Sequence, residues 1–342
     1  MNSGAPLTQP VQEIHPVLPR IGFVGLGWIG KHRMKAITDL GNSEIVGIVE
    51  PHPEFAAAAR SLAPNATICS FPELLRSGID GIVIATPSAL HAQQAIAALE
   101  NGISVFCQKP LARNAAEAAR VVDAARSANR LLRVDLSYRY VDGIRQIRRL
   151  ISAGALGRVY AIDLVFHNAY GPDKSWFYDR TLSGGGCLID LGIHLVDLAL
   201  WMLDFPRISE VQSRLFRNGC PFEASGTDVE DYATANLYLV GDIHVQLSCS
   251  WKAHAGRDAV IQATFYGSEG GATLYNVNGS FYDFVAEHFQ GTQKRTLAVP
   301  PDPWGGRAVV DWLNQLTRSN VFEPGTEHLL DVAEALDRIY GL

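Results

Sequence analysis

Residues 20–30 read RIGFVGLGWIG, and the rest of the chain is best interpreted outward from them. The short apolar run Ile21–Val24 predicts a strand, and the pattern Gly25, Gly27, Gly30 opens a helical stretch that reaches about Leu40. Such glycines allow a tight turn and let the backbone approach a pyrophosphate, which a helix N-terminus stabilises. The pattern alone is weak because the chain holds 31 glycines, so its context decides its meaning.

That context is an acidic residue at the end of the next predicted strand. The β-branched run Glu44–Val49 is followed by Glu50, 20 residues after Gly30. A carboxylate here can bind the ribose diol of an adenosine and would repel a 2′-phosphate. No Arg or Lys follows before Arg60, so the sequence favours NAD over NADP. A strand-turn-helix without a ligand is the alternative reading of the same pattern.

Short apolar runs continue to alternate with helical segments as far as Val134. After Glu50 the predicted helices are Glu54–Leu62, Pro72–Ser77, Ala89–Asn101 and Ala115–Ala128, and the predicted strands are Gly81–Ala85, Ser104–Cys107 and Leu131–Val134. This rhythm is typical of an α/β fold with a doubly wound parallel sheet.

Beyond Tyr138 strands follow one another and predict a mostly antiparallel or mixed sheet. The predicted strands are Tyr160–Phe166, Tyr232–Leu239, His244–Trp251 and Ala259–Tyr266, and the predicted helices are Ile144–Ser152, Leu188–Leu203, Gly306–Leu316 and Glu327–Ile339. We therefore expect an extended N-terminal arm (1–19), a nucleotide-binding domain (20–136), and a substrate-binding and oligomerisation domain (137–342).

The composition of the 342 residues is that of an ordinary globular protein, with 47% hydrophobic and 19% charged residues. The formal charge of −6 argues against nucleic acid and anionic lipid as partners. Five dispersed cysteines without a CxxC pair indicate reduced thiols in a cytoplasmic protein. The sequence contains no run of about 18 apolar residues, so we expect no membrane span.

Polar residues follow two of the predicted strands of the first domain. Thr86, Pro87 and His91 come after Gly81–Ala85, and Gln108 and Lys109 come after Ser104–Cys107. Ligands of open α/β sheets bind beyond the carboxyl ends of the strands, so we expect these residues at one cleft. Pro110 restricts Lys109 to an extended conformation, which favours a lysine held in the cleft over a solvated one.

A glycine-rich segment, Gly184–Gly186, precedes the apolar helix of the second domain. Asp190 and His194 are four residues apart and Asp197 continues their face, while the glycines would let a substrate approach the helix entrance. An imidazole beside a carboxylate can move a proton near neutral pH. A core helix packing its polar face against the other domain explains the spacing equally well. Asp190, His194 and His167 as metal ligands are disfavoured, because no HExxH or paired-His spacing exists.

Together GLGWIG, ATPSALH, QKP in place of the usual EKP, and GGGCLIDLGIHLVD resemble the glucose–fructose oxidoreductase, inositol dehydrogenase and rhizopine catabolism (Gfo/Idh/MocA) family, from Arg20 to the C-terminus. The resemblance implies a Rossmann domain, a second α/β domain with an open sheet, and NAD(P)-dependent oxidation or reduction of a secondary alcohol on a sugar, cyclitol or related polyol. It assigns Lys109 as the catalytic lysine, Asp190 as the substrate-orienting aspartate and His194 as the general acid/base. Gln108 departs from the family pattern and removes a negative charge beside Lys109.

The predicted site residues form two sets. The expected cofactor contacts are Gly25, Gly27, Trp28, Ile29, Gly30, Glu50, Thr86, Pro87, His91, Gln108 and Lys109. The expected substrate contacts, chosen among polar and aromatic residues of the second domain, are Arg139, Tyr140, His167, Asn168, Trp176, Tyr178 and His254.

Two other classes of function fit the same residues. One is a non-redox glycosidase that uses tightly held NAD for oxidation, elimination and reduction. The other is a non-catalytic NAD-sensing protein, which the presence of Lys109, Asp190 and His194 together disfavours. We also expect a homodimer or homotetramer, because strands such as His244–Trp251 carry apolar residues on both faces and the open side of their sheet needs a cover.

Overall fold

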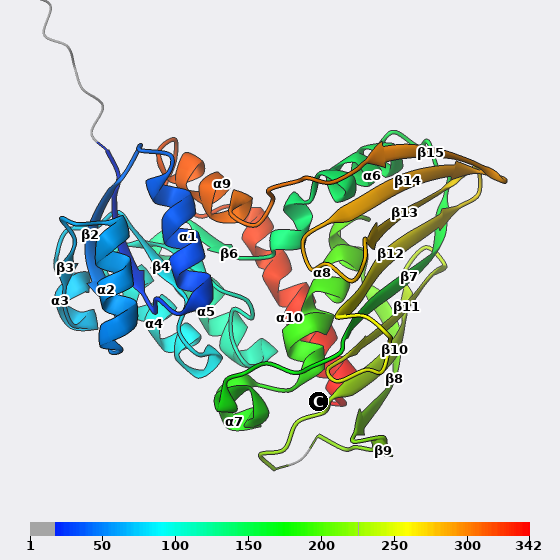
Figure 1. Ribbon diagram of the computed structural model, residues 1–342, viewed down its shortest axis with the longest axis horizontal. Coiled ribbons are helices and arrows are strands. Elements are labelled where there is room, and N and C mark those ends of the chain that lie inside the picture. Colours follow the sequence, from blue (N-terminus) through cyan, green and yellow to red (C-terminus); the bar gives the residue numbers. More distant parts are fainter. Residues whose placement is uncertain (1–17, 225) are drawn as a thin grey trace, which may run out of the picture.

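The computed structural model describes residues 18–224 and 226–342, and Figure 1 shows two sheets with helices between and around them. Of the predicted N-terminal arm, all but the last two residues lie outside the described residues. The first sheet has six parallel strands, which lie in the order β3 (Thr67–Ile68), β2 (Glu44–Val49), β1 (Arg20–Val24), β4 (Gly81–Ile84), β5 (Ser104–Cys107) and β6 (Leu132–Val134). The predicted doubly wound parallel sheet is confirmed.

Helices cover both faces of this sheet. They are α1 (Trp28–Thr38), α2 (Pro53–Leu62), α3 (Phe71–Leu75), α4 (Ser88–Glu100) and α5 (Ala115–Ala128). Strands β4 and β5 are buried along their whole length, which explains why both read as continuous apolar runs. The order of the strands reverses at β1 and β4, so a crevice opens beyond the carboxyl ends of these two strands.

The second sheet is mixed and has nine strands. They lie in the order β15 (Gln293–Ala298), β14 (Phe284–Gln290), β13 (Gly271–Asn276), β12 (Ala259–Gly267), β7 (Val159–Asn168), β11 (Ile243–Ser250), β10 (Tyr232–Leu239), β8 (Ile208–Arg217) and β9 (Cys220–Pro221). Only β7 and β11 pair in parallel. The mostly antiparallel sheet is confirmed.

Helices cover one face of the second sheet, the face toward the first domain (Figure 1). They are α6 (Asp142–Ser152), α7 (Arg180–Ser183), a π-helical turn (Leu188–Gly192), α8 (Ile193–Trp201) and α10 (His328–Tyr340), with 3-10 turns at Ser137–Tyr140, Ser175–Tyr178 and Pro324–Glu327. The predicted helix Leu188–Leu203 is thus not one regular α-helix, because it begins with the π-helical turn.

Contrary to the expectation from the sequence, strand β11 does not carry apolar residues on both faces. Val245, Leu247 and Cys249 are buried toward the helices, whereas His244, Gln246 and Ser248 point the other way. The premise of apolar residues on both faces was therefore wrong for this strand. The predicted homodimer or homotetramer remains a prediction.

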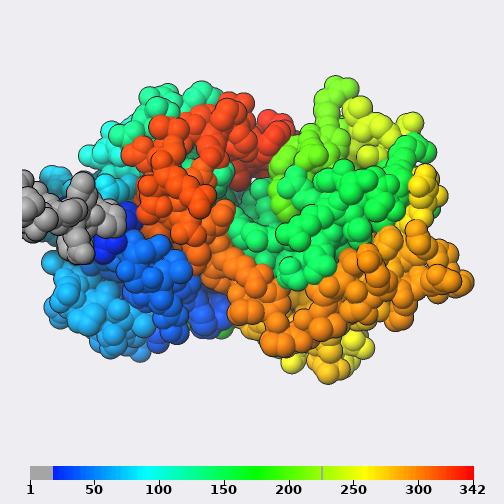
Figure 2. All heavy atoms as spheres, turned by 90° about the horizontal axis from the view of Figure 1, so that it is seen from above, coloured from blue at the N-terminus to red at the C-terminus, as the bar shows by residue number. Residues whose placement is uncertain are grey.

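Helix α9 (Arg307–Leu316) returns to the first domain, although it follows the whole second sheet in sequence. Trp312 is fully buried, and its ring lies 5.8 Å from that of Phe106 on β5. Val309 and Leu313 join the same core as Ile21 and Phe23. Figure 2 shows the orange segment that crosses from the second domain onto the first. The first domain's core therefore includes a helix from near the C-terminus.

Among the described residues, one helical stretch passes a length and composition test for a membrane span. It runs from Arg180 to Trp201, and 83% of its most apolar window is buried inside the fold. A core helix passes the same test, so this is weak evidence for a span.

Candidate active site

A large cleft lies beyond the carboxyl ends of β1, β4 and β5 and continues to the second domain. It encloses about 3040 Å³ when its open mouth is counted. Ten of the eleven predicted cofactor residues line it: Gly25, Gly27, Trp28, Ile29, Glu50, Thr86, Pro87, His91, Gln108 and Lys109. Gly30 is buried behind this wall. Asp190 and His194 line the same cleft.

The three glycines of the turn differ in what surrounds them. Gly25 has a φ of +81°, and a Cβ there would lie 2.6 Å from the carbonyl oxygen of Ala85. A Cβ on Gly30 would lie 2.1 Å from the carbonyl oxygen of Gly25, so this position fixes the helix against the strand. A Cβ on Gly27 would meet nothing within 4 Å. The open space beside Gly27, at the N-terminus of α1, fits the approach of a pyrophosphate.

Glu50 lines the cleft and also holds the glycine turn. Its Oε2 accepts a hydrogen bond of 2.5 Å from the backbone N–H of Leu26, and its Oε1 accepts one of 2.9 Å from the backbone N–H of His52. The carboxylate thus lies beside the glycine turn, where the sequence analysis expects the ribose of an adenosine. Its negative charge is the feature that would repel a 2′-phosphate.

His91 connects the two loops that carry Thr86 and Lys109. Its Nδ1 lies 2.7 Å from the carbonyl oxygen of Pro110, and its Nε2 lies 2.8 Å from that of Thr86. Burial lowers the pKa of His91, and a neutral imidazole donates to one of these two oxygens at a time. His91 therefore acts mainly by fixing the loops at the cleft wall.

Lys109 and Asp190 meet across the cleft from different domains. Lys109 Nζ donates to Asp190 Oδ1 at 2.7 Å and to the Asp190 backbone oxygen at 2.6 Å. The indole N–H of Trp251, just after β11, donates to Asp190 Oδ2 at 3.1 Å. Both carboxylate oxygens are therefore occupied, and neither hydrogen-bonds to His194. Sequence reasoning missed Trp251, whose position at a strand end was the available signal.

His194 lies one turn further along the helix, with 7% of its surface exposed. Its ring lies 4.8 Å from that of Tyr138, and its Nδ1 has no hydrogen-bond partner among the described residues. Burial, followed by the positive charges of Lys109 and Arg33, lowers the pKa of His194 well below its ordinary value. The imidazole is therefore neutral at pH 7 and able to accept a proton.

Gln108 belongs to a buried network that the sequence did not indicate. Its amide nitrogen donates to Oδ2 of Asp135, and Arg33 of α1 forms an ion pair with the same carboxylate. Arg33 also donates to the carbonyl oxygen of Gly305, just before α9. Asp135 follows β6 as Gln108 follows β5, so the end of the strand places them together. A glutamate at position 108 would set two carboxylates against each other.

The glycine-rich segment before the π-helical turn has a structural explanation that differs from the predicted one. A Cβ on Gly186 would lie 1.9 Å from the backbone oxygen of Glu230, and one on Gly185 would lie 2.0 Å from the Tyr340 hydroxyl. The buried Glu230 carboxylate accepts hydrogen bonds from Leu188 N at 2.8 Å and from the Tyr340 hydroxyl at 2.9 Å. The glycines admit these groups, which fix the start of the helix that bears Asp190.

Two predictions about neighbouring residues need correction. Asp197 does not continue the face of Asp190 and His194 into the cleft, because it is buried in an ion pair with Arg139. Arg139 and Tyr140 line a different hollow, where the Tyr140 hydroxyl donates to Asp311 at 2.8 Å.

Of the seven predicted substrate contacts, only Trp176 lines the cleft. The Nδ1 atom of His167 lies 2.8 Å from the hydroxyl of Ser250, and the His167 ring stacks on Tyr232 on the outer side of the sheet. The Tyr178 hydroxyl donates to the backbone oxygen of Pro172 at 2.9 Å, which braces the loop that carries Trp176. Asn168 and His254 do not line the cleft either. The aromatic residues that sequence reasoning missed in the second-domain wall are Tyr138, Phe177, Phe281, Tyr282 and Trp304.

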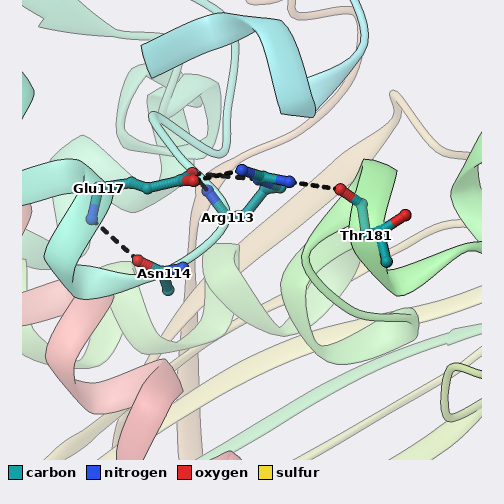
Figure 3. A network of polar contacts seen from close by, with 4 residues as sticks. All are labelled: Arg113, Asn114, Glu117 and Thr181. Atoms are coloured by element: carbon teal, nitrogen blue, oxygen red, sulfur yellow. Dashed lines mark hydrogen bonds and ion pairs between the residues drawn. The ribbon is translucent and has the colours of Figure 1, made fainter. Parts of the chain in front are cut away.

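A polar bridge joins the two domains beside the cleft, as Figure 3 shows. Arg113 donates from Nη1 to the backbone oxygen of Thr181 in α7 at 2.5 Å, and it pairs with Glu117 of α5. The Asn114 side chain accepts from the Glu117 backbone N–H at 2.8 Å and caps α5. The bridge ties the loop after Lys109 to the segment that leads into the glycines before Asp190.

Within residues 18–224 and 226–342 no group of three or more His, Cys, Asp or Glu side chains is placed to hold a metal ion. Lys109, Asp190 and His194 are charged or titratable groups that line the same cleft.

Comparison with known proteins agrees with this geometry. Residues 19–136 match the model described as "Oxidoreductase family, NAD-binding Rossmann fold", and residues 144–273 match "GFO/IDH/MocA C-terminal domain". The "Putative UDP-kanosamine synthase oxidoreductase subunit" of Amycolatopsis mediterranei is 33% identical over 71% of each chain. The D-glucoside 3-dehydrogenase of Escherichia coli is 25% identical over 75% of this chain and 77% of its own.

A solved structure of levoglucosan dehydrogenase with NADH and L-sorbose has the same fold, with a TM-score of 0.79 and 23% identity over 94% of this chain and 96% of its own. The two family models match the first domain and the first part of the second domain, in order along the sequence. The chain belongs to the Gfo/Idh/MocA family of oxidoreductases, which act on sugars and polyols, and its first domain is an NAD-binding Rossmann fold.

Proposed function

We propose that the protein transfers a hydride between NAD and a secondary alcohol of a sugar, cyclitol or related polyol. One observation carries the proposal: Lys109 Nζ lies 2.7 Å from Asp190 Oδ1, with a neutral, buried His194 in the same cleft as the glycine turn. NAD, when bound, supplies the hydride acceptor for oxidation of the alcohol. The names of the relatives that act on a glucoside, on inositol and on levoglucosan support the same chemistry.

Each of the three residues has a distinct task in this reaction. His194 accepts the hydroxyl proton as the carbon–oxygen double bond forms, since its ring is neutral at pH 7. Lys109 places positive charge at the oxygen on which negative charge develops. Asp190, held by Lys109 and Trp251, orients the lysine and offers carboxylate oxygens to a neighbouring hydroxyl of the substrate.

The cofactor preference rests on Glu50, whose carboxylate lines the cleft beside the glycine turn. We expect NAD to bind more tightly than NADP in calorimetric titrations. Glu50→Ser should narrow the difference, because it removes both the ribose contact and the repulsion of a 2′-phosphate. Tighter binding of NADP by the unchanged protein would contradict this preference.

The experiment that tests the function incubates the purified protein with NAD and a panel of sugars, cyclitols and sugar acids, and follows the nicotinamide absorbance. Formation of NADH with a member of the panel, lost in His194→Ala, supports the proposal. Cleavage of a glycoside without net NADH formation would instead favour the glycosidase. Binding of NAD with neither reaction would favour a sensing role.

A further inference from the structure

The second-domain wall of the cleft is aromatic, and among the residues that the structure describes it holds no unpaired lysine or arginine. The six aromatic residues that line it are Tyr138, Trp176, Phe177, Phe281, Tyr282 and Trp304. From this combination we propose that the substrate is an uncharged sugar or glycoside, held against aromatic rings, and that sugars bearing a phosphate are poor substrates. The proposal rests on the proposed function and specifies its substrate class.

The aromatic side chains form two groups, one linked to Asp190 through Trp251 and the other in contact with His194 through Tyr138. Trp176 and Phe177 stack at 3.8 Å, and Phe177 meets the edge of Trp251, whose indole holds Asp190. In the second group, the ring of Trp304 lies 5.1 Å from that of Tyr138 and 6.2 Å from that of Tyr282, and its indole N–H donates to the Tyr282 backbone oxygen at 3.0 Å. Both groups are therefore fixed next to Asp190 and His194.

Such walls suit a sugar ring better than a charged group. The C–H bonds of a pyranose carry a partial positive charge, and the faces of aromatic rings carry a partial negative charge. The ring can pack its C–H face on Trp176 or Tyr282 while its hydroxyls reach Asp190 and Lys109. A phosphate placed against the same rings would lose hydration without gaining an unpaired lysine or arginine among the described residues.

The positive charges of the cleft are all matched by carboxylates. Among the described residues that line it, the lysines and arginines are Arg33, Lys109 and Lys174. Arg33 is paired with the buried Asp135, and Lys109 is paired with Asp190. Lys174 lies at the exposed mouth, 3.2 Å from Asp173. Sites that recognise phosphate commonly use arginine or lysine with a free set of donors, and this wall offers none.

The test compares matched pairs of substrates with NAD in the full-length protein. Glucose is compared with glucose 6-phosphate, and phenyl β-glucoside with phenyl β-glucoside 6-phosphate. We expect kcat/KM for the uncharged member to exceed that for the phosphorylated member by roughly 10²-fold, because a phosphate against the rings loses hydration that no lysine or arginine of the described wall replaces. A preference for the phosphorylated member would overturn the proposal while leaving the oxidoreductase function intact.

Variants show whether the aromatic wall carries the selectivity. Trp176→Ala should raise KM for the uncharged sugar by about 10-fold with a smaller change in kcat, because the ring acts on binding. Tyr160→Ala, an exposed tyrosine on β7 outside the cleft, is the matched control and should leave both constants unchanged. Equal KM values in Trp176→Ala and the control would overturn the role of the wall.

Lys174 needs a separate test. Its ion pair with Asp173 is exposed, so the lysine could leave this partner and bind a phosphate. Lys174→Ala should leave the ratio of the two kcat/KM values as it is in the unchanged protein. A fall in turnover of the phosphorylated sugar alone would show that Lys174 recognises phosphate and would overturn the proposal. If neither member of any pair reduces NAD although NAD binds, the proposed function itself fails.

Discussion

His194 combines a buried position with a cationic neighbourhood, and both lower the pKa of its ring. His194→Ala should reduce turnover by roughly 10²- to 10⁴-fold, the usual contribution of a general base. NAD affinity should remain nearly unchanged, because the base acts in the transition state. Steady-state kinetics and calorimetry measure the two quantities. Near wild-type turnover in this variant would remove His194 from the mechanism.

The pH profile tests the same residue through its surroundings. Oxidation requires neutral His194, so kcat/KM should fall only at a pH well below 6.5, the ordinary pKa of a histidine. Lys109→Met removes a charge that lowers this pKa, so the acid limb of the residual activity should move to higher pH. Lys294→Met, which removes an exposed lysine of β15, is the control and should not move it. An acid limb at or above pH 6.5 in the unchanged protein would contradict the assignment.

Gln108 differs from the family pattern for a reason that is visible around its side chain. Gln108→Glu places a second carboxylate against Asp135, and two carboxylates in contact raise the pKa of one of them. The fold should lose about 1–3 kcal/mol at pH 8 and recover as the pH falls through the raised pKa, because a shared proton removes the repulsion. Urea unfolding at pH 8 and pH 5 measures this.

The double variant Gln108→Glu with Asp135→Asn is the matched control, since it exchanges the amide and the carboxylate between the two positions. It should regain most of the stability at pH 8, because Arg33 still has one carboxylate to pair with. Equal stability of Gln108→Glu at both pH values would show that the pair is not in contact.

At the level of elements, two glycines of the turn matter for different properties: Gly30 for stability and Gly27 for cofactor binding. Gly30→Ala brings a Cβ to 2.1 Å from the Gly25 oxygen and should cost about 1–3 kcal/mol of stability. Gly27→Ala meets nothing within 4 Å in the protein, so it should lower stability by less than about 1 kcal/mol. It should nevertheless weaken NAD binding at least about tenfold, because its methyl group occupies the space beside the pyrophosphate.

Urea unfolding without cofactor and calorimetric titration with NAD distinguish the two variants. Gly27→Ala binding NAD as tightly as the unchanged protein would show that the phosphate path lies elsewhere.

The sequence predicted those elements whose apolar pattern is complete. Glu44–Val49, Ser104–Cys107, Ala115–Ala128 and Tyr232–Leu239 have the predicted bounds, because each is buried on one or both faces. Strands β8 and β15 were missed, since they lie toward the edges of the second sheet and carry mainly polar, exposed residues. Strands β13 and β14 were missed as well, although most of their residues are at least partly buried. The π-helical turn was missed because its apolar residues resemble those of an α-helix.

In the candidate site, too, local sequence patterns predicted some residues and missed others. Lys109, Asp190 and His194 come together as the motifs implied, although their assigned roles stay predictions until activity is measured. Trp251, Asp135 and the aromatic wall could not be read from local patterns, because tertiary packing of distant segments brings them to the cleft. Arg139, which was predicted to contact the substrate, instead forms an ion pair with the buried Asp197.

At the scale of the whole molecule, the helix-free face of the second sheet bears on assembly (Figure 1). Tyr232 and Tyr238 stack there on His167 and His244, and such amphipathic rings are enriched at protein interfaces. We expect a homodimer or homotetramer at micromolar concentration by light scattering. Tyr232→Glu should weaken it, whereas Tyr170→Glu, an exposed tyrosine off this sheet, should not. A monomeric unchanged protein would contradict the prediction.

The return of α9 to the first domain has a consequence during protein synthesis. Ribosomes add about 5–20 residues per second, so the roughly 180 residues between positions 136 and 312 take about 10–35 s to emerge. Throughout that interval the side of β5 that bears Phe106 lacks the indole of Trp312 that covers it in the finished protein. The nascent first domain therefore leaves this apolar surface uncovered, and it completes its core only after α9 has been synthesised.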